Sequence, residues 1–300
     1  MNRILMTTGQ GEFVETEYHC PEIGTNEIEV KNIMTGVCRS DIDMMQGNFG
    51  PLPLHMQGHE GLGRVTKVGS AIFDIGIGDF VATRGEPAYA DVYTVRQYEY
   101  VRIPEAHPRY IIEPVACGVN IVNQALSELR WRQGRNSKLL ILGSGFLAWV
   151  AYHTITKQIR LQFDIDVVGN SNRDLWGDKL LVSTDKQYDC IIDLSSKGDV
   201  FDSDLYKENA LIIMAAAKSQ PANTTFEKML WKSVTMIFPS PRNSKFYQCM
   251  KDAVWMIENG HLDVDKFWTR SYNRNTEWQQ AFKDGADRPA NYSRGYIEWQ

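Results

Sequence analysis

The pattern of hydrophobic and polar residues changes near residue 120 and divides the chain into two parts. In the first part, short apolar stretches are separated by glycine and proline, and residues 27–33 alternate polar side chains with Ile28, Val30 and Ile33. Such alternation is typical of half-buried strands. Comparable stretches are residues 61–68, 79–83 and 89–95, with a turn predicted at 76–79. We therefore predict that the first part is all-β with many turns.

The second part alternates between helical and strand-like segments. A helical pattern over residues 121–130 precedes the continuous apolar run 139–142, and a glycine turn and a second helical pattern follow. Further strands are predicted at 166–168, 190–194, 211–215 and 234–238. This alternation predicts a parallel sheet with crossover connections. After Pro241 the chain holds one amphipathic helix and short mixed elements, so we expect three segments: 1–118, 119–240 and a C-terminal segment, 241–300, that packs back on the first.

Composition adds limits on the class of protein. A length of 300 residues makes two domains the default expectation, and a formal net charge of −5 provides no general attraction to nucleic acid or to an anionic membrane. No window approaches the roughly 18 apolar residues of a membrane span, and the chain starts with a strand-like run instead of a signal peptide. Five cysteines form no C-x-x-C pair, which favours a reducing compartment, the cytoplasm, over a disulfide framework.

The clearest local motif follows the strand predicted at 139–142. It has the form G-x-G-x-x-A, with Gly143, Gly145 and Ala148 in the three small positions. The first glycine permits a tight turn, the second lets a pyrophosphate approach the backbone, and the third position needs a small residue for packing. The free N–H groups of the following helix would then face the anion, so we predict nucleotide contacts at Gly143, Gly145, Phe146 and Leu147.

The end of the next strand indicates which nicotinamide cofactor is preferred. An NAD site normally has an Asp or Glu there, about 20 residues after the glycine turn, for the ribose hydroxyls. This chain has Asn170, Ser171 and Arg173 in that region. A carboxylate would repel a 2′-phosphate, whereas Ser171 and Arg173 could bind one. We therefore expect NADP(H) to be favoured over NAD(H), with a solvated turn as the alternative interpretation of this segment.

Cys38 and His59 raise the question of a metal site. Each lies beside a predicted strand, in Gly36-Val-Cys-Arg-Ser-Asp41 and in Gly58-His-Glu-Gly61. Thiolate and imidazole suit zinc, and a catalytic zinc needs three protein ligands and an open position. A single cysteine or histidine is more often a buried structural residue. Their spacing alone leaves both interpretations open.

Taken together, the motifs resemble the zinc-containing medium-chain dehydrogenase/reductase family, the alcohol, sorbitol and cinnamyl alcohol dehydrogenase group. The resemblance covers almost the whole chain. Its segments, all in family order, are 36–41, 58–65, Val68-Gly69, 78–81, Glu113-Pro-Val-Ala-Cys117 and the dinucleotide turn. The fold this implies is α/β: a GroES-like β-barrel catalytic domain, closed by the C-terminal segment, and a Rossmann coenzyme domain with a doubly wound parallel sheet.

The resemblance also implies a set of metal ligands. Cys38 and His59 match the first two ligands of the catalytic zinc, and Glu113 falls where the third is Cys, Asp or Glu in different members. Cys117 is a rival third ligand, and Glu113 is preferred because residues 112–116 resemble the branch that uses Glu. Glu60 matches a neighbour that can approach the metal.

Other site residues follow from the same resemblance. Asp41 matches the carboxylate that orients the ligand histidine, and Ser40 matches the hydroxyl that exchanges a proton with the substrate oxygen. Asp43 stands where many members place a histidine that completes the proton relay, so the end of that relay is open. Arg39 and Arg294 lie where family members bind the cofactor pyrophosphate.

Two departures from the family change the expected protein. The four-cysteine lobe of a second, structural zinc should follow Gly78-Asp79, but the chain continues directly from Gly85 to Tyr89, so we expect one zinc ion. Only fifteen residues separate Arg173 from Asp189, which predicts an abbreviated Rossmann domain.

The resulting expectation is an alcohol dehydrogenase or aldehyde reductase that depends on one zinc ion and NADP(H) and acts on a small alcohol, aldehyde or ketone. A zinc-free quinone or enoyl reductase on the same fold and a non-catalytic NADP-binding derivative are the alternatives. We expect a homodimer or other homo-oligomer, with residues 234–238 as an edge strand for pairing. Candidates for the substrate pocket are Phe49, Tyr89 and Phe238.

Overall fold

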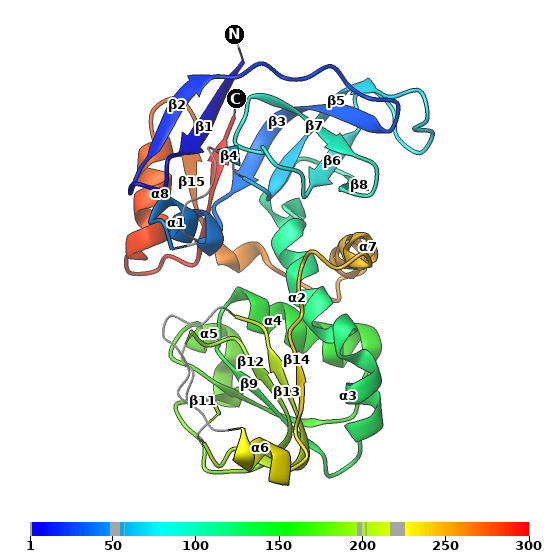
Figure 1. Ribbon diagram of the computed structural model, residues 1–300, viewed down its shortest axis with the longest axis vertical. Coiled ribbons are helices and arrows are strands. Elements are labelled where there is room, and N and C mark those ends of the chain that lie inside the picture. The colour runs from blue at the N-terminus through cyan, green and yellow to red at the C-terminus, as the bar shows by residue number, and fades with distance from the viewer. Residues whose placement is uncertain are drawn as a thin grey trace. The chain divides into compact units, whose positions relative to one another are not determined.

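The computed structural model describes residues 2–48, 55–56, 58–196, 200–201, 203–216 and 226–299. It divides into two compact units, which are described separately. One unit contains Met1–Val115 together with Met250–Gln300, and the other contains Ala116–Cys249. Figure 1 shows that strands dominate the first unit and that the second is a sheet flanked by helices.

The first unit is built on two β-sheets. A three-stranded sheet has the order β2-β1-β4, and a larger sheet has the order β15-β16-β3-β5-β6-β8, with β7 also paired to β3. Alternation in β5 places Val65 in the core and Arg64 in solvent, as its sequence pattern predicts. The strands of this unit are β1 (Arg3–Thr7), β2 (Phe13–Glu17), β3 (Glu27–Gly36), β4 (His55–Met56), β5 (Gly61–Val68), β6 (Phe80–Thr83), β7 (Val92–Arg96), β8 (Tyr100–Ile103), β15 (Trp268–Asn273) and β16 (Arg294–Glu298).

The last residues of the chain complete the first unit. Strand β16 pairs antiparallel with β3, and β15 pairs in parallel with β16. The amphipathic helix α8 packs its apolar face on this unit, where Phe282 stacks on Phe13 with ring centroids 3.7 Å apart. The helices here are α1 (Arg39–Met45), α8 (Trp278–Asp287), the 3-10 turns η1 (Pro108–Tyr110) and η4 (Asp265–Phe267), and parts of α2 (Glu113–Gln124) and α7 (Phe246–Glu258).

The second unit is a six-stranded parallel sheet in the order β11-β10-β9-β12-β13-β14. Counted along the chain from β9, this is the order 3-2-1-4-5-6 of a Rossmann fold. Its strands are β9 (Lys138–Leu142), β10 (Asp164–Val168), β11 (Leu180–Leu181), β12 (Tyr188–Asp193), β13 (Tyr206–Met214) and β14 (Thr235–Ile237). The other elements are α3 (Leu126–Arg132), α4 (Phe146–His153), the π-helical turn η2 (Thr154–Ile159), α5 (Arg173–Trp176), the 3-10 turn η3 (Gly177–Lys179) and α6 (Glu227–Trp231).

Burial on both faces explains why the strands of this sheet are continuously apolar. In β9, Leu139 and Ile141 join the core cluster on one face, where α2, α3 and α4 pack. Leu140, between them in sequence, joins the opposite cluster together with Ile191 and Ile212. Successive side chains of a strand point to opposite faces, so a sheet covered on both sides needs apolar residues at every position. The expected parallel sheet is confirmed.

The shortness of the segment between β10 and β12 is also confirmed. It contains the four-residue helix α5, one 3-10 turn and the two-residue strand β11. Two other elements differ from the sequence expectation. The helix expected over 121–130 is divided into α2 and α3 at Ala125, whose φ of −100° and ψ of 5° leave the helical region. Helix α1 was not expected at all, because its seven residues are too few to display a helical period. Among the described residues, no helix is long and apolar enough to cross a membrane.

Candidate metal centre and nucleotide-binding turn

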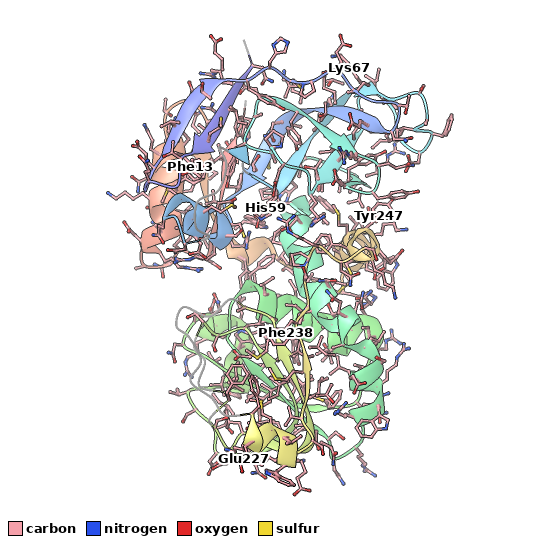
Figure 2. The ribbon with its side chains drawn as sticks, in the orientation of Figure 1. Phe13, His59, Lys67, Glu227, Phe238 and Tyr247 are labelled. Atoms are coloured by element: carbon pink, nitrogen blue, oxygen red, sulfur yellow. The ribbon has the colours of Figure 1, made fainter. Side chains whose placement is uncertain are left out.

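Cys38, His59 and Glu60 converge in the first unit. Cys38 is the residue before α1, directly after β3, and His59 and Glu60 lie just before β5. One donor atom from each lies within 4.8 Å of the other two, and this is the one such cluster found among the described residues. Figure 2 labels His59 near helix α1, the element that carries its closest charged neighbour, Asp41. Thiolate, imidazole and carboxylate form a donor set that zinc accepts, so the residues fit that metal.

Asp41 connects the two sequence segments of this cluster. Its carboxylate is fully buried, its Oδ2 atom accepts a hydrogen bond from the Cys38 backbone N–H at 3.0 Å, and its Oδ1 atom lies 3.5 Å from His59 Nδ1. A carboxylate on one ring nitrogen of a histidine fixes the tautomer and leaves the other nitrogen to bind a metal. Asp41 thus lies next to His59, and its role in orienting that histidine stays a prediction.

The charges of the cluster favour a bound cation. Burial lowers the pKa of His59, but the Asp41 carboxylate and the Cys38 thiol outweigh it and raise the pKa overall. Burial raises the pKa of the Cys38 thiol, and the negative charge of Glu60 raises it further. A divalent cation would act against both shifts, because it stabilises the Cys38 thiolate and competes with the proton on the His59 imidazole.

The negative charge of Glu60 is paired with the positive charge of Arg294, which lies near the C-terminal end of the sequence. Arg294 Nη2 donates to both carboxylate oxygens of Glu60, at 2.6 and 2.5 Å; Glu60 is fully buried and Arg294 is mostly buried, with 13% of its side chain exposed. Burial lowers the pKa of Arg294, but the charge of Glu60 outweighs it and the pKa rises overall. Gly36 makes room for this pair, because a Cβ atom there would lie 2.1 Å from Glu60 Oε2. Arg294, expected at the cofactor pyrophosphate, therefore contacts Glu60 here.

Close backbone packing explains the glycines on both sides of the ligands. Gly58 has a φ of +93°, and a Cβ atom there would lie 2.6 Å from Tyr89. A Cβ atom on Gly61 would lie 2.2 Å from the Tyr93 hydroxyl, and one on Gly63 would lie 2.4 Å from the Lys31 carbonyl oxygen. The small residues around His59 and Glu60 are therefore required by the neighbouring strands.

The remaining residues predicted for catalysis lie on or near α1. Ser40 is the second residue of α1 and is half-buried, two positions after Cys38. Arg39 donates to Asp43 through a 3.0 Å ion pair that is partly exposed. Glu113 is buried at the first position of α2 and is not a member of the cluster of Cys38, His59 and Glu60. Cys117 belongs to the second unit.

The substrate-pocket candidates have different outcomes. Phe49 lies outside the described residues. Phe238 follows β14 and is 67% exposed. Tyr89 is completely buried and its hydroxyl donates to Asp41 Oδ2 at 2.8 Å, so it cannot line a pocket. The aromatic character that suggested a pocket residue does not distinguish one from a core residue with a buried hydroxyl.

In the second unit, the glycine motif forms the turn between β9 and α4. Gly143 has a φ of +116°, which a residue with a side chain rarely adopts. Gly145 precedes α4, and a Cβ atom there would meet nothing within 4 Å, so the space above the backbone is open. Ala148 is buried against the sheet, as the third small position requires. Phe146 and Leu147 form the first turn of α4.

A second turn, after β10, is tied to the glycine turn through Ser144. The Ser144 hydroxyl accepts from the Ser171 backbone N–H at 3.0 Å, and Asn172 and Trp176 donate to its carbonyl oxygen at 2.9 and 3.0 Å. Asn170, Ser171 and Arg173 are exposed on this turn. Sequence analysis missed the role of Ser144, because a variable position of a glycine motif carries no signal that singles it out. It missed the role of Trp176 because this side chain lies 32 positions further along the chain.

Comparison with known proteins agrees with this description. Residues 24–107 match the alcohol dehydrogenase GroES-like domain. Sorbitol dehydrogenase of Ovis aries is 35% identical over 96 residues, which are 31% of this chain and 27% of that protein. The chain thus matches about a quarter of the length of this curated relative.

Solved structures match over nearly the full length. A short chain alcohol dehydrogenase from Escherichia coli complexed with NADH gives a TM-score of 0.83 at 15% identity, covering 99% of both chains. A zinc-binding dehydrogenase from Sinorhizobium meliloti bound to NADP gives 0.78 at 17% identity, again covering 99% of both. At these identities the match concerns the fold.

A GroES-like unit and a Rossmann-like unit in one chain define a class of protein, that of the alcohol dehydrogenase fold. The fold is that of the medium-chain dehydrogenase/reductase family, and the first unit contains a segment that is similar in sequence to sorbitol and alcohol dehydrogenases.

Proposed function

We propose that the chain is an alcohol dehydrogenase or aldehyde reductase that depends on one zinc ion and on NADP(H). The observation that carries the proposal is the cluster of Cys38, His59 and Glu60, with Asp41 behind His59. A structural role alone does not require a thiol, an imidazole and a carboxylate in mutual reach, since buried polar groups are normally paired in simpler ways.

The residues of the first unit would have separate roles in metal binding and proton transfer. Cys38, His59 and a carboxylate hold the zinc ion, which supplies Lewis acidity toward an alcohol or carbonyl oxygen. Asp41 keeps His59 in the tautomer that can bind the metal. Ser40, two residues after Cys38, would carry the proton exchanged with the substrate oxygen, and Asp43, three residues further along α1, would be a later group of the proton relay.

The nucleotide would bind on the second unit. Gly143 and Gly145 leave the backbone open to a pyrophosphate, and the first turn of α4 directs N–H groups toward it. The phosphate contacts that the family resemblance implies for Arg39 and Arg294 stay predictions. A bound nicotinamide would supply the hydride chemistry, and the residues around the glycine turn would hold the cofactor in place.

We expect replacement of Arg173 by alanine to raise the KM for NADPH about tenfold or more, because a charge-assisted contact to phosphate contributes roughly 1.5–3 kcal/mol. The KM for NADH should not change, since that cofactor lacks the 2′-phosphate. Steady-state kinetics with both cofactors check this. Lys179→Ala, at another exposed cation of the same region, is the control. An equal loss for both cofactors, or none, would remove Arg173 from the specificity site.

The identity of the third ligand is tested by two isosteric changes. Glu60 already lies within reach of Cys38 and His59, so Glu60→Gln should weaken zinc binding more than Glu113→Gln does. Loss of the negative charge also leaves Arg294 buried without its partner carboxylate, so the metal-free protein should be destabilised. Competition with a chelator measures the affinity, and thermal unfolding of the metal-free variants measures the second effect separately. A larger loss of affinity for Glu113→Gln would assign the third position to Glu113.

Two experiments separate this proposal from its alternatives. Metal analysis of the purified protein should find about one zinc per chain, whereas a zinc-free quinone or enoyl reductase would contain none. Oxidation of NADPH and NADH in the presence of a panel of aldehydes, ketones and polyols should show turnover, whereas a non-catalytic NADP-binding derivative would bind cofactor without it. We further propose small alcohols, polyols or their carbonyl products as substrates, a cytoplasmic location, and a homo-oligomer that pairs through the outermost strand β14.

A further inference from the structure

Tyr89 is a buried tyrosine whose hydroxyl contacts Asp41, the carboxylate next to His59 of the candidate metal centre. The side chain has no solvent exposure, and its hydroxyl donates to Asp41 Oδ2 at 2.8 Å and lies 3.1 Å from the Gly36 carbonyl oxygen. Its ring contacts Phe13 and Phe282 edge-on, with centroids 5.8 and 5.3 Å away. Figure 2 labels Phe13, which lies on β2 at this side of the unit. Phe13 and Phe282 stack on each other, so both contact the Tyr89 ring from the same side, and these contacts help to fix the position of its hydroxyl.

The two oxygens of Asp41 have different partners. Oδ2 accepts from the Tyr89 hydroxyl and from the Cys38 backbone N–H, whereas Oδ1 lies 3.5 Å from His59 Nδ1. Two donors on one oxygen hold the carboxylate plane in one rotation, because a buried carboxylate loses free energy when it turns away from its donors. In this rotation the second oxygen is the one directed at His59.

Tyr89 also contacts the segment that carries His59. The backbone N–H of Ala88 donates to the Gly58 carbonyl oxygen at 2.7 Å, and a Cβ atom on Gly58 would lie 2.6 Å from the Tyr89 ring. Gly58 immediately precedes His59. Tyr89 therefore packs against Gly58, the residue before His59, and also donates to the carboxylate that faces the His59 imidazole.

The hydroxyl is a donor throughout the pH range in which the protein would be assayed. Burial raises the pKa of the Tyr89 phenol well above its ordinary value, and the negative charge of Asp41 raises it further. A protonated phenol has one hydrogen to donate, and the carboxylate oxygen is its nearest acceptor.

We infer that Tyr89 is a positioning residue that orients the Asp41 carboxylate toward His59 and thereby sets the metal affinity of the Cys38–His59–Glu60 centre. The inference rests on the proposed zinc site. Tyr89 touches none of the reacting atoms and acts through Asp41, as outer groups around a metal do when they hold a ligand in its binding orientation.

The test removes one oxygen atom. In the full-length protein, Tyr89→Phe keeps the ring and its contacts with Phe13 and Phe282 but removes the donor to Asp41. We expect the affinity for Zn²⁺, measured by competition with a chelator, to fall about tenfold. The visible absorption of the Co²⁺-loaded protein should change as well, because it reports the geometry around the metal. The rise in Tm on adding Zn²⁺ to the metal-free protein should be smaller.

Tyr272→Phe is the matched control. Tyr272 is also buried in the first unit, and its hydroxyl donates to a buried carboxylate, Asp284 Oδ2, at 2.7 Å. This pair belongs to no metal cluster found among the described residues. Both variants lose one hydrogen bond between a phenol and a carboxylate, so their metal-free forms should lose similar stability. Only Tyr89→Phe should change the zinc affinity and the Co²⁺ spectrum.

The outcomes are separable. If the unchanged protein binds no zinc, the proposed function fails. If it binds zinc and Tyr89→Phe binds it equally or more tightly with the same Co²⁺ spectrum, the inference about Tyr89 is overturned while the zinc site stands. An equal fall of affinity in Tyr89→Phe and Tyr272→Phe would also overturn it, because the effect would then be one of general stability.

Discussion

Replacing Cys38 with serine is expected to abolish stoichiometric zinc binding and to reduce turnover to background. A serine hydroxyl is nearly the size of a thiol but stays protonated and is a poor ligand for zinc, which favours thiolate. Loss of a direct ligand should exceed the roughly 10- to 100-fold effect of removing an outer partner, so the affinity should fall by more than about 100-fold. Metal analysis after gel filtration and a turnover assay with NADPH measure the two effects.

The control for this substitution is Cys20→Ser. Cys20 is a half-buried cysteine of the same unit that lies outside the metal cluster, so its replacement should leave zinc content and turnover unchanged. Circular dichroism should show that both variants fold. A folded Cys38→Ser protein that retains one zinc per chain would exclude Cys38 as a ligand. It would therefore contradict the proposed zinc site.

The second large effect is expected for Gly58→Ala, next to His59. The φ of +93° costs a residue with a side chain roughly 1–3 kcal/mol. The new Cβ atom would also lie 2.6 Å from the backbone nitrogen and the ring of Tyr89, an overlap that backbone atoms cannot relieve cheaply. Such overpacking adds about 1–3 kcal/mol, so the total loss should be about 3 kcal/mol or more. Chemical denaturation measures it.

Gly78→Ala isolates the part of this cost that comes from contact. Gly78 has nearly the same φ, +96°, but a Cβ atom there would meet nothing within 4 Å. Its replacement should therefore cost only the backbone strain, the same roughly 1–3 kcal/mol that applies to Gly58. If the two variants were equally stable, the close approach of Gly58 and Tyr89 would not be a constraint on the fold.

Local pattern was sufficient to predict much of the second unit. The run Leu139–Leu142 is apolar at every position because both faces of its strand are buried, and this condition is visible without any knowledge of the neighbours. The glycine turn is equally local, since Gly143 needs its positive φ and Gly145 its open space for reasons internal to the turn. Helix α1 could not be predicted in this way, because its residues carry site chemistry instead of a helical pattern.

Contacts between side chains that lie far apart in the sequence could not be predicted from local patterns. Glu60 and Arg294 are 234 positions apart, and only the antiparallel pairing of β16 with β3 brings Arg294 to the site. Tyr89 was assigned to a substrate pocket from its aromatic character, and its contact with Asp41 depends on the packing of Gly58 beside it. Neither contact produces a recognisable pattern in the residues around it in the sequence.

For this protein, sequence alone determined the two-part architecture, the dinucleotide turn and the candidacy of Cys38 and His59, because periodicity and turn chemistry act over a few residues. Only the tertiary structure showed that the donor atoms of Cys38, His59 and Glu60 lie within reach of one another. It alone also showed that Arg294 pairs with Glu60 and that the Tyr89 hydroxyl donates to Asp41. The reason is physical: a buried charge needs a partner, and the partner is whichever residue the packing of the strands brings within a few ångströms.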